Sequence, residues 1–397
     1  MKSSSSYSRR FFLQFAGMTA AAAGGVARPA FEVSASLYAW DLHDEGIERI
    51  LDNLQQMAAV DSVYLIALMH YERRPLTSAE FPHNPVRKMF QAEDSRAYWL
   101  PDMKRYGRIK PRLSDLDWLN RTDWLRTLVE AARKRGLRTG VEISHTVIDG
   151  ERAKGEFIDC VQRDINGQPI VFGPTYPICP NSPDARQYVV NLSLELATRY
   201  DVDYLMTCTL PFMRGGVKTG GCFCQNCVKA ATFDLHKVQA VLKRNPTAQP
   251  ELGQWLEFRK ESLARYYKAM YDGLHAARKD AELRFNDCFN GPAWGLDVKP
   301  LKPYLDSIRV CDYSEQTGDP ARMQDKRDWL TRERAAVGKD FPMVSAIAVR
   351  PKATPELIRE GVKIAVECGM NGITLGHYDG AEFPMLRAIR DGLKAAR

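Results

Sequence analysis

The chain has 397 residues, of which 45% are hydrophobic and 26% are charged. This composition is ordinary for a globular protein and argues against a disordered or fibrous chain. The formal net charge of +7 is too small for this length to indicate binding to nucleic acid or to an acidic membrane surface.

The first thirty residues have the organisation of an export signal. Arg9 and Arg10 precede a bulky apolar pair, Phe12 and Leu13, and a weakly apolar run follows that ends in small residues. This pattern is similar to the twin-arginine motif, which implies export by the twin-arginine translocase. The alternative is a chance Arg-Arg pair before a short anchor, but the run is shorter than the roughly 20 residues of a membrane span. The sequence therefore predicts a signal peptide over residues 1–30 and a periplasmic mature protein without a stable membrane span.

From residue 31 onward, short apolar runs rich in β-branched residues alternate with amphipathic stretches, and no linker interrupts them. Eight such units predict one (β/α)8 TIM barrel over residues 31–397. The rival fold is an open doubly wound sheet, which normally has a glycine-rich phosphate loop after its first strand. The chain has no such loop there. The predicted strands are residues 32–40, 62–69, 137–145, 202–210, 283–290, 307–313, 342–349 and 372–379.

The longest predicted insertion, about residues 71–121, follows the second strand and carries Tyr98, Trp99 and Tyr106 among many charged residues. Aromatic rings suit the apolar faces of sugars, and long loops in compact domains are often functional. We therefore expect either a loop that covers a substrate or a structural excursion.

Three cysteines, Cys222, Cys224 and Cys227, lie in the loop after the fourth strand with the spacing C-x-C-x-x-C. Thiolates this close can converge on one cation, and tetrahedral zinc needs a fourth ligand. Cys179, just before the preceding helix, is the first candidate for that ligand, and Cys208 at the end of the fourth strand is the second. A disulfide to Cys179 is the main alternative, because export leads to an oxidising compartment. Unpaired thiols and an iron–sulfur cluster are further alternatives.

The run CPNSPDARQYVVNLSLELATRYDVDYLMTCTLPF, followed by GGCFCQNC, looks like the corresponding segment of family-42 β-galactosidases and related hypothetical glycosyl hydrolases. The stretch LVEAARKRGLRTGVEISH resembles the helix and strand that precede that segment. The resemblance covers roughly residues 98–230. It implies that Cys179, Cys222, Cys224 and Cys227 hold a structural zinc ion.

The same galactosidases carry an acid/base glutamate at the end of the fourth strand and a nucleophilic glutamate at the end of the seventh. Here these two strands end in TCTLPF and AIAVRP, so neither carboxylate is present. Retaining hydrolysis by that pair is not expected, although the fold inference stands because a fold does not fix its function.

Other acids are predicted at the strand ends. Alternation along the third strand turns Glu142 toward the barrel interior, where a carboxylate must be paired, hydrogen-bonded or protonated. Glu142 is therefore the first candidate for a catalytic acid, and Asp312 is the second. The alternative for Glu142 is a salt bridge to an inward arginine such as Arg309 or Arg284, and the alternative for Asp312 is a loop cap.

Polar and aromatic side chains at the strand ends are candidates for substrate binding. A single histidine is more often packed or exposed than functional, but two histidines here each close a strand next to acids. The candidates are Tyr38, Trp40, His70, His145, Asn286, Tyr313, Arg350 and His377.

Three functions are compatible with this pattern. The favoured hypothesis is an exported glycoside hydrolase in which two carboxyl groups flank a sugar in the barrel mouth. The second is a metal-dependent sugar isomerase or lyase, in which Glu142, Asp287, Asp312 and His377 bind a second divalent ion. The third is a barrel that binds a sugar without catalysis, as the missing glutamate pair suggests.

Overall fold

The structure of the protein is a computed structural model. The apolar run and the two arginines of the predicted signal peptide, and the candidate binding residue His70, lie outside the residues that it describes. The described residues are 25–69, 81–88, 90, 95–208, 212–213, 220–288, 296–350 and 352–396.

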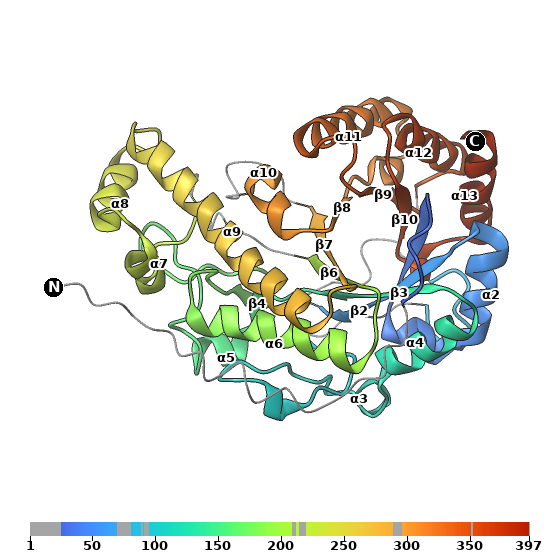
Figure 1. Ribbon diagram of the computed structural model, residues 1–397, viewed down its shortest axis with the longest axis horizontal. Helices are drawn as coiled ribbons and strands as arrows, with labels where there is room; N and C mark the ends of the chain where they lie inside the picture. The colour runs from blue at the N-terminus through green and yellow to red at the C-terminus, as the bar shows by residue number, and fades with distance from the viewer. Residues whose placement is uncertain are drawn as a thin grey trace.

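Eight parallel strands form a closed barrel, which confirms the predicted (β/α)8 architecture (Figure 1). Strands that follow one another in the chain are neighbours in the barrel, except that β4 (Val147–Asp149) and β5 (Thr175–Pro177) form a separate antiparallel pair. The first and last barrel strands pair directly, with Glu32 beside Gly372. This closure excludes the open doubly wound sheet. The barrel strands are β1 (Glu32–Leu37), β2 (Ser62–Leu68), β3 (Arg138–Ile143), β6 (Tyr204–Cys208), β7 (Glu282–Asp287), β8 (Ser307–Val310), β9 (Met343–Ala348) and β10 (Gly372–Gly376).

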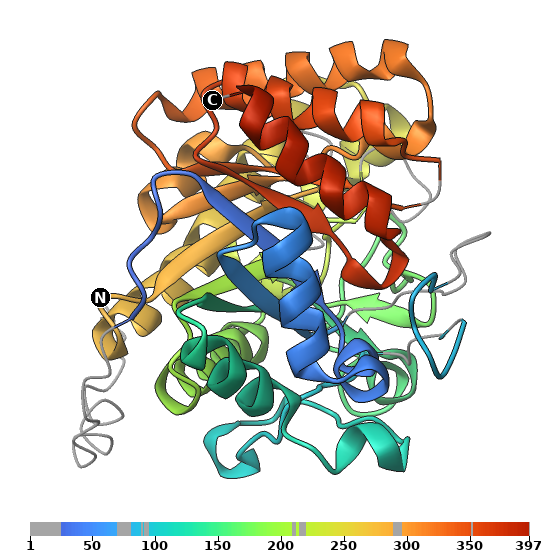
Figure 2. The same ribbon diagram turned by 90° about the vertical axis from the view of Figure 1, so that its right-hand side faces the viewer.

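Helices surround the barrel. They are α1 (Ala39–Glu45), α2 (Ile47–Ala58), α3 (Asp117–Asn120), α4 (Trp124–Lys134), α5 (Gly150–Lys154), α6 (Pro183–Arg199), α7 (Gln225–Ala230), α8 (Leu235–Arg244), α9 (Glu251–Ala277), α10 (Val298–Leu301), α11 (Met323–Val337), α12 (Pro355–Glu367) and α13 (Phe383–Ala396). Short 3-10 turns cover Met103–Arg105, Lys302–Tyr304, Ser314–Thr317, Pro320–Arg322 and Tyr378–Gly380. The other units of the barrel have a longer helix between their strands. Between β7 and β8, the described residues form only the short helix α10 and the 3-10 turn Lys302–Tyr304. Figure 2 shows α13 beside α2, where the last and first units of the barrel meet.

Two barrel helices begin at caps that the sequence contains. The Ser182 hydroxyl accepts the Ala185 N–H at 3.4 Å at the start of α6, and the Thr354 hydroxyl accepts the Leu357 N–H at 3.3 Å at the start of α12. Each helix has a proline in its first turn. The missing proline N–H is harmless there, because the first N–H groups of a helix have no partner within it.

A network of buried charges closes the end of the barrel where the strands begin. Arg284 Nη2 lies 2.8 Å from Glu32 Oε2, and Arg138 donates to Glu32 at 2.9 Å and to Glu282 at 2.8 Å. Burial alone would raise the pKa of Glu282, but Arg284, Arg28 and Arg138 hold it well below its usual range. Leaving one of these buried charges unpaired would cost several kcal/mol. This network fills the barrel interior at the end where the strands begin.

The segment between β2 and α4 packs its aromatic side chains inward. Tyr98 and Trp99 are fully buried, and the buried Tyr106 hydroxyl donates to Glu195 of α6. Tyr98 also lies edge-on to Trp40, with ring centroids 6.1 Å apart. Among the described residues of this segment, these three aromatic rings support the fold and do not present a face to solvent.

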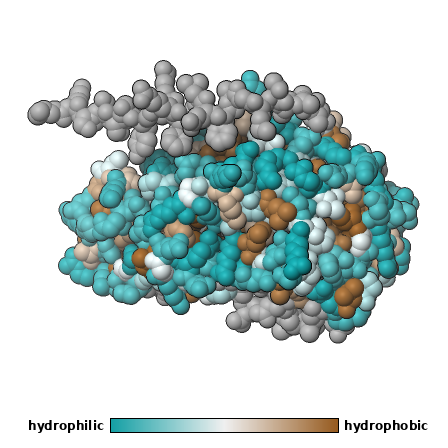
Figure 3. Space-filling view, turned by 90° about the horizontal axis from the view of Figure 1, so that it is seen from below, coloured by the Kyte–Doolittle hydropathy of each residue, from teal (hydrophilic) through white to brown (hydrophobic). Residues whose placement is uncertain are grey.

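The face in Figure 3 is mainly hydrophilic, and its hydrophobic residues form small, separate areas. No helix within the described part of the chain is long and apolar enough to cross a membrane.

Candidate functional site

The strand ends opposite the closed end of the barrel form its mouth, which is where (β/α)8 enzymes place their active sites. Side chains that are partly exposed to solvent mark this end: Cys288 after β7, Tyr313 after β8, Arg350 after β9 and His377 after β10. Three of these four residues are substrate-binding candidates from the sequence, and the fourth, Cys288, is not.

Glu142 on β3 points into the barrel, as the strand alternation predicts, and its side chain is almost fully buried. Its charge acts on Arg309 of β8 and on Tyr64 of β2, across the barrel interior. Burial raises the pKa of the Tyr64 hydroxyl, and the Glu142 carboxylate raises it further. Glu142 is thus a carboxylate in the interior at mouth level, facing a guanidinium and a phenol.

Arg309 connects several mouth residues. Its Nη1 donates to Asn286 Oδ1 at 2.8 Å and to Cys311 Sγ at 3.2 Å, and its Nη2 donates to the Tyr313 hydroxyl at 2.7 Å. Burial alone would lower the pKa of Arg309, but the nearby Cys311, Tyr313, Tyr64 and Glu142 outweigh this effect and raise it. The structure therefore brings the candidates Asn286 and Tyr313 together through a permanently charged group.

Arg309 was visible in the sequence only as a possible salt-bridge partner of Glu142. The sequence pattern that could have indicated its contacts with other mouth residues is SIRVCDY. In this run Arg309 occupies an inward position, two residues before Cys311 and four before Tyr313. Buried arginines need several acceptors, and polar neighbours at alternate positions of one strand can supply them.

Asp312 lies on the other side of the barrel wall. Its Oδ1 accepts the Ser314 N–H at 2.9 Å and is 3.6 Å from Lys326 Nζ on α11. Lys326 is fully buried and also pairs with Glu315 at 2.8 Å. Asp312 therefore occupies the loop-cap position, on the helix side, whereas Glu142 occupies the interior, and the structure does not place the two carboxyl groups on one face.

His377 is held at the mouth by β1. Its backbone N–H donates to Ser36 Oγ at 2.8 Å, Nδ1 lies 3.2 Å from the same oxygen, and Nε2 lies 3.5 Å from the Tyr38 hydroxyl. The backbone of His377 has a φ of 53°, in the left-handed region that non-glycine residues rarely adopt. Such strain persists only where surrounding contacts impose it, and it clusters at functional sites.

Tyr38 and Trp40 form an aromatic stack below His377. Their rings are 4.2 Å apart and almost parallel, and Trp40 Nε1 donates to Asp379 Oδ2 at 3.3 Å. Both rings are buried, at 1% and 0% exposure. They support the imidazole of His377, whose ring stacks on Tyr38 at 5.0 Å, and they do not themselves offer an open face to a ligand.

Two other candidates lie against helices. His145 is fully buried, its Nδ1 is 2.9 Å from the Tyr266 hydroxyl of α9, and burial lowers its pKa to about 3. Asp287 is fully buried on the helix side of β7, where burial and the nearby Glu333 of α11 raise its pKa to about 8. His145 is therefore neutral and Asp287 is protonated at neutral pH.

The proposed quartet for a second divalent ion is split by this arrangement. Glu142 points into the barrel and His377 lies at its mouth, whereas Asp287 and Asp312 lie against α11. Arg350, the last candidate for substrate binding, lies near Gly380. A Cβ atom added to Gly380 would lie 3.3 Å from the Cγ atom of Arg350.

The four cysteines of the predicted metal site come together. The sulfur atoms of Cys179, Cys222, Cys224 and Cys227 all lie within 4.8 Å of one another, and all four side chains are buried. Cys224 precedes α7, Cys227 lies in its first turn, and Cys179 precedes α6. Cys179 is thus the fourth member, and Cys208, the second candidate, is not part of this group.

The surroundings of the cluster suit thiolates bound to a cation. The Asn181 N–H points to Cys179 Sγ at 3.4 Å, the Asn181 side-chain amide to Cys227 Sγ at 3.3 Å, and the Arg163 N–H to Cys222 Sγ at 3.3 Å. Donors aimed at sulfur stabilise its negative charge and orient metal ligands. The Cys179 and Cys227 sulfurs are 3.4 Å apart, whereas a disulfide bond measures about 2.05 Å. None of the nine cysteines, all of which the structure describes, is in a disulfide.

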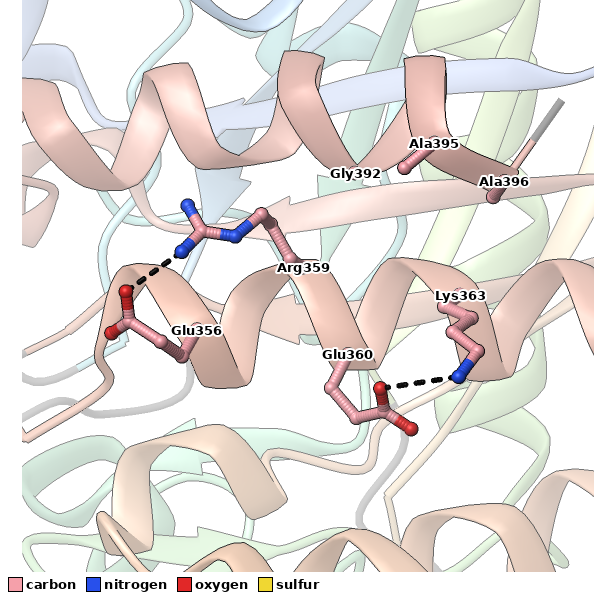
Figure 4. A pocket seen from close by; sticks show the side chains of 7 residues that line it. All are labelled: Glu356, Arg359, Glu360, Lys363, Gly392, Ala395 and Ala396. Carbon is pink, nitrogen blue, oxygen red and sulfur yellow. Dashed lines mark hydrogen bonds and ion pairs between the residues drawn. The ribbon is translucent and has the colours of Figure 1, made fainter.

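Two grooves on the surface of the protein lie away from this mouth. One of about 280 Å³ runs between α12 and α13 and is lined by exposed ion pairs, with Arg359 donating to Glu356 at 2.7 Å (Figure 4). It forms where Gly392 lets the two helices approach closely. A second, of about 370 Å³, lies at the closed end of the barrel around Arg28 and Glu282. Neither contains a residue from the strand ends.

No family model matches the chain, and no curated protein matches it. Solved glycosidase structures do match. The α-L-fucosidase isoenzyme 2 from Paenibacillus thiaminolyticus has a TM-score of 0.61 at 13% identity, over 93% of this chain and 49% of that one. The β-galactosidase from the Antarctic haloarchaeon Halorubrum lacusprofundi has a TM-score of 0.63 at 13% identity, over 92% of this chain and 58% of that one. Gan42B, a GH42 β-galactosidase, has a TM-score of 0.60 at 13% identity, over 94% and 57%.

The chain spans about half the length of these glycosidases. At such identities the similarity concerns the fold alone. The chain is a TIM barrel that resembles the barrels of GH42 β-galactosidases and other glycoside hydrolases, with a buried four-cysteine cluster beside its mouth.

Proposed function

We propose that this protein is an exported, glycoside-hydrolase-like protein whose barrel mouth takes a sugar or oligosaccharide. The observation that carries the proposal is the buried carboxylate of Glu142 inside the mouth of a glycosidase-type barrel, where its charge acts on Arg309. The β-galactosidases and the fucosidase of similar fold act on glycosides, as their names state.

The chemistry of the mouth suits sugar hydroxyls. Asn286, Arg309 and Tyr313 form one hydrogen-bonded chain on β7 and β8, and His377 stands partly exposed after β10, two strands along the barrel from β8. Planar guanidinium and amide groups make paired hydrogen bonds to neighbouring oxygens. In this arrangement the Asn286–Arg309–Tyr313 chain orients the sugar while Glu142 accepts a proton or a hydroxyl hydrogen.

Hydrolysis of a glycoside normally uses two carboxyl groups. Glu142 is the one we assign to proton transfer, since it is buried in the barrel interior and its charge acts on the Arg309 guanidinium. Asp312 could act as the second acid only if its contacts with Ser314 and Lys326 were broken, so its catalytic role stays a prediction.

We further propose that the four-cysteine cluster holds one structural zinc ion. Four thiolates satisfy the tetrahedral preference of zinc and leave no open position for a substrate. The ion would join the loop before α6 to the loop before α7, and thereby fix the chain next to the ends of β3 and β6. The chemistry of the mouth does not pass through it.

The experiment that tests the function measures binding and turnover separately. The purified protein is titrated with a panel of mono- and oligosaccharides by calorimetry and is assayed on aryl glycosides with and without a chelator. Turnover that survives chelation supports a glycoside hydrolase. Turnover that depends on added Mn²⁺ or Mg²⁺ supports an isomerase or lyase, binding without turnover supports a sugar-binding barrel, and absence of both refutes the proposal.

A further inference from the structure

Three further cysteines line one wall of the barrel mouth. Cys208 ends β6, Cys288 follows β7 and Cys311 follows β8. The strand register places Cys208 beside Asn286, and the Cys311 N–H donates to the Asp287 carbonyl at 3.0 Å. Cys288 and Cys311 are therefore neighbours on adjacent parallel strands, and Cys208 lies on the next strand.

Cys288 is the central and most accessible thiol of this trio. The neighbouring thiols of Cys208 and Cys311 raise its pKa. Cys288 is partly exposed, whereas Cys208 and Cys311 are each only 7% exposed. A reagent that enters the mouth therefore meets Cys288 first.

Cys311 has the surroundings of a nucleophilic thiol. Arg309 Nη1 lies 3.2 Å from its sulfur, and its S–H donates to Asn286 Oδ1 at 2.6 Å. The guanidinium can stabilise the negative charge that develops on this sulfur when it attacks a disulfide. The two neighbours thus differ, with Cys288 accessible and Cys311 placed beside a cation.

A metal site does not account for this trio. Among the described residues, the groups whose ligand atoms all lie within 4.8 Å of one another are the four-cysteine cluster and the set Asp159, Cys160 and Asp184. Cys208, Cys288 and Cys311 do not form such a group. Their chemistry is therefore pairwise, through Cys288.

We propose that Cys288 and Cys311 form a redox-active dithiol in the barrel mouth, and that its substrate is a low-molecular-weight disulfide. The Cys288 sulfur attacks the external disulfide, so that one thiol leaves with the Cys288 proton and a mixed disulfide forms. The Cys311 sulfur then attacks the Cys288 sulfur, and the second thiol leaves with the Cys311 proton. Two protein thiols are oxidised to one protein disulfide, and one external disulfide is reduced to two thiols.

The backbone permits this bond. Neighbouring strands lie about 4.8 Å apart, within the Cα separations of roughly 4.4–6.8 Å found across disulfides. Cys288 and Cys311 each follow by two residues a side chain of the mouth network, Asn286 and Arg309, so strand alternation turns both toward the mouth. Burial and the adjacent thiols raise the pKa of Cys288, so the first step should become faster with rising pH as its thiolate forms.

The test uses the folded, metal-loaded protein and oxidised glutathione as the probe. After acid quenching and alkylation, peptide mapping by mass spectrometry should find Cys288 joined to Cys311. Cys368, a partly exposed thiol beside Thr331 on the outer helices, serves as the internal control and should carry glutathione. A Cys288 that keeps glutathione in the wild type, stays unmodified, or joins Cys208 instead would overturn the proposal.

Two variants separate the roles. In Cys311→Ser, Cys288 should retain one glutathione, which shows both that the mouth is accessible and that Cys311 resolves the mixed disulfide. In Cys208→Ser, the bond between Cys288 and Cys311 should form as in the wild type. Loss of the bond in Cys208→Ser, with an unchanged melting temperature, would instead assign the resolving role to Cys208. These outcomes do not depend on the proposed carbohydrate function.

Discussion

The side-chain amide of Asn181 donates to the Cys227 sulfur at 3.3 Å and to the Ser262 hydroxyl of α9 at 3.0 Å. One residue therefore links the four-cysteine cluster to the longest helix of the barrel. Donors in this position usually orient metal ligands, and their loss costs about 10–100-fold in metal affinity. We expect Asn181→Ala to retain one zinc ion at saturating metal but to bind it more weakly, which competition with a chromophoric chelator measures.

Replacing a ligand should have a larger effect. Because a closed zinc site exists only in the folded chain, metal binding contributes directly to folding. Cys224→Ser should lower both the zinc content and the melting temperature. Cys368→Ser, at a partly exposed cysteine outside the cluster, is the control and should change neither. Elemental analysis that finds no stoichiometric metal in the wild type would remove zinc from consideration.

Glu142→Gln keeps the shape and hydrogen-bonding capacity of the side chain and removes its ionisation. If Glu142 transfers protons, turnover on the best glycoside found should fall by about 10² to 10⁴, with little change in melting temperature. Asp312→Asn is the matched comparison. Because Asp312 lies 3.6 Å from Lys326 and caps Ser314, we expect that variant to lower the melting temperature. A loss of turnover at unchanged stability would show Asp312 to be the second acid.

Lys326 is fully buried and pairs with the fully buried Glu315 at 2.8 Å. Burial raises the pKa of Glu315, and the ammonium group of Lys326 only partly offsets this effect. Lys326→Met would leave Glu315 without its cation, and breaking one buried pair costs about 3–5 kcal/mol. Lys268→Met removes a surface ion pair with Asp272 and should leave the urea midpoint almost unchanged. Equal effects of the two variants would contradict this account.

Asp287 should make stability depend on pH. Its pKa is about 8 in the folded protein and roughly 3.9 in an unfolded chain. Between these values the folded state binds more protons than the unfolded state, so the free energy of unfolding falls as pH rises, by up to about 1.4 kcal/mol per pH unit. In Asp287→Asn this contribution should be absent. Urea unfolding of both proteins between about pH 4 and 8 measures the difference in slope, and parallel curves would contradict the prediction.

Export remains a prediction of the sequence, because residues 1–24 lie outside the described residues. Changing Arg9 and Arg10 to lysine should trap the precursor in the cytoplasm, since the translocase requires the arginine pair. Fractionation and immunoblotting of cells that express each version measure this. Unchanged export, or export in cells without the translocase, would show that another route is used.

The fold was predictable because its signals are local. Each strand is an apolar run, and caps such as Ser182 and Thr354 mark where helices begin. The four-cysteine cluster was equally visible, since three of its members lie within six residues and Cys179 stands before the adjacent helix.

The arrangement of the mouth was less visible, because it depends on which face of a strand each end residue occupies. Glu142 lies within a strand, and alternation placed it inside. Asp287 and Asp312 lie at strand ends, where they turn toward α11, and a strand end in the sequence does not specify that choice. Cys288 and Cys311 gained significance only when the register placed them side by side.

The seam of the barrel also affects how the protein is made. β1 pairs with β10 through Glu32 and Gly372, so the first strand has no partner on one side until the ribosome has translated nearly the whole chain. At about 5–20 residues per second, the nascent chain carries two unpaired strand edges for tens of seconds. Unpaired edges invite pairing with other chains. We therefore expect that slowing translation before β10 increases the share of aggregated chains.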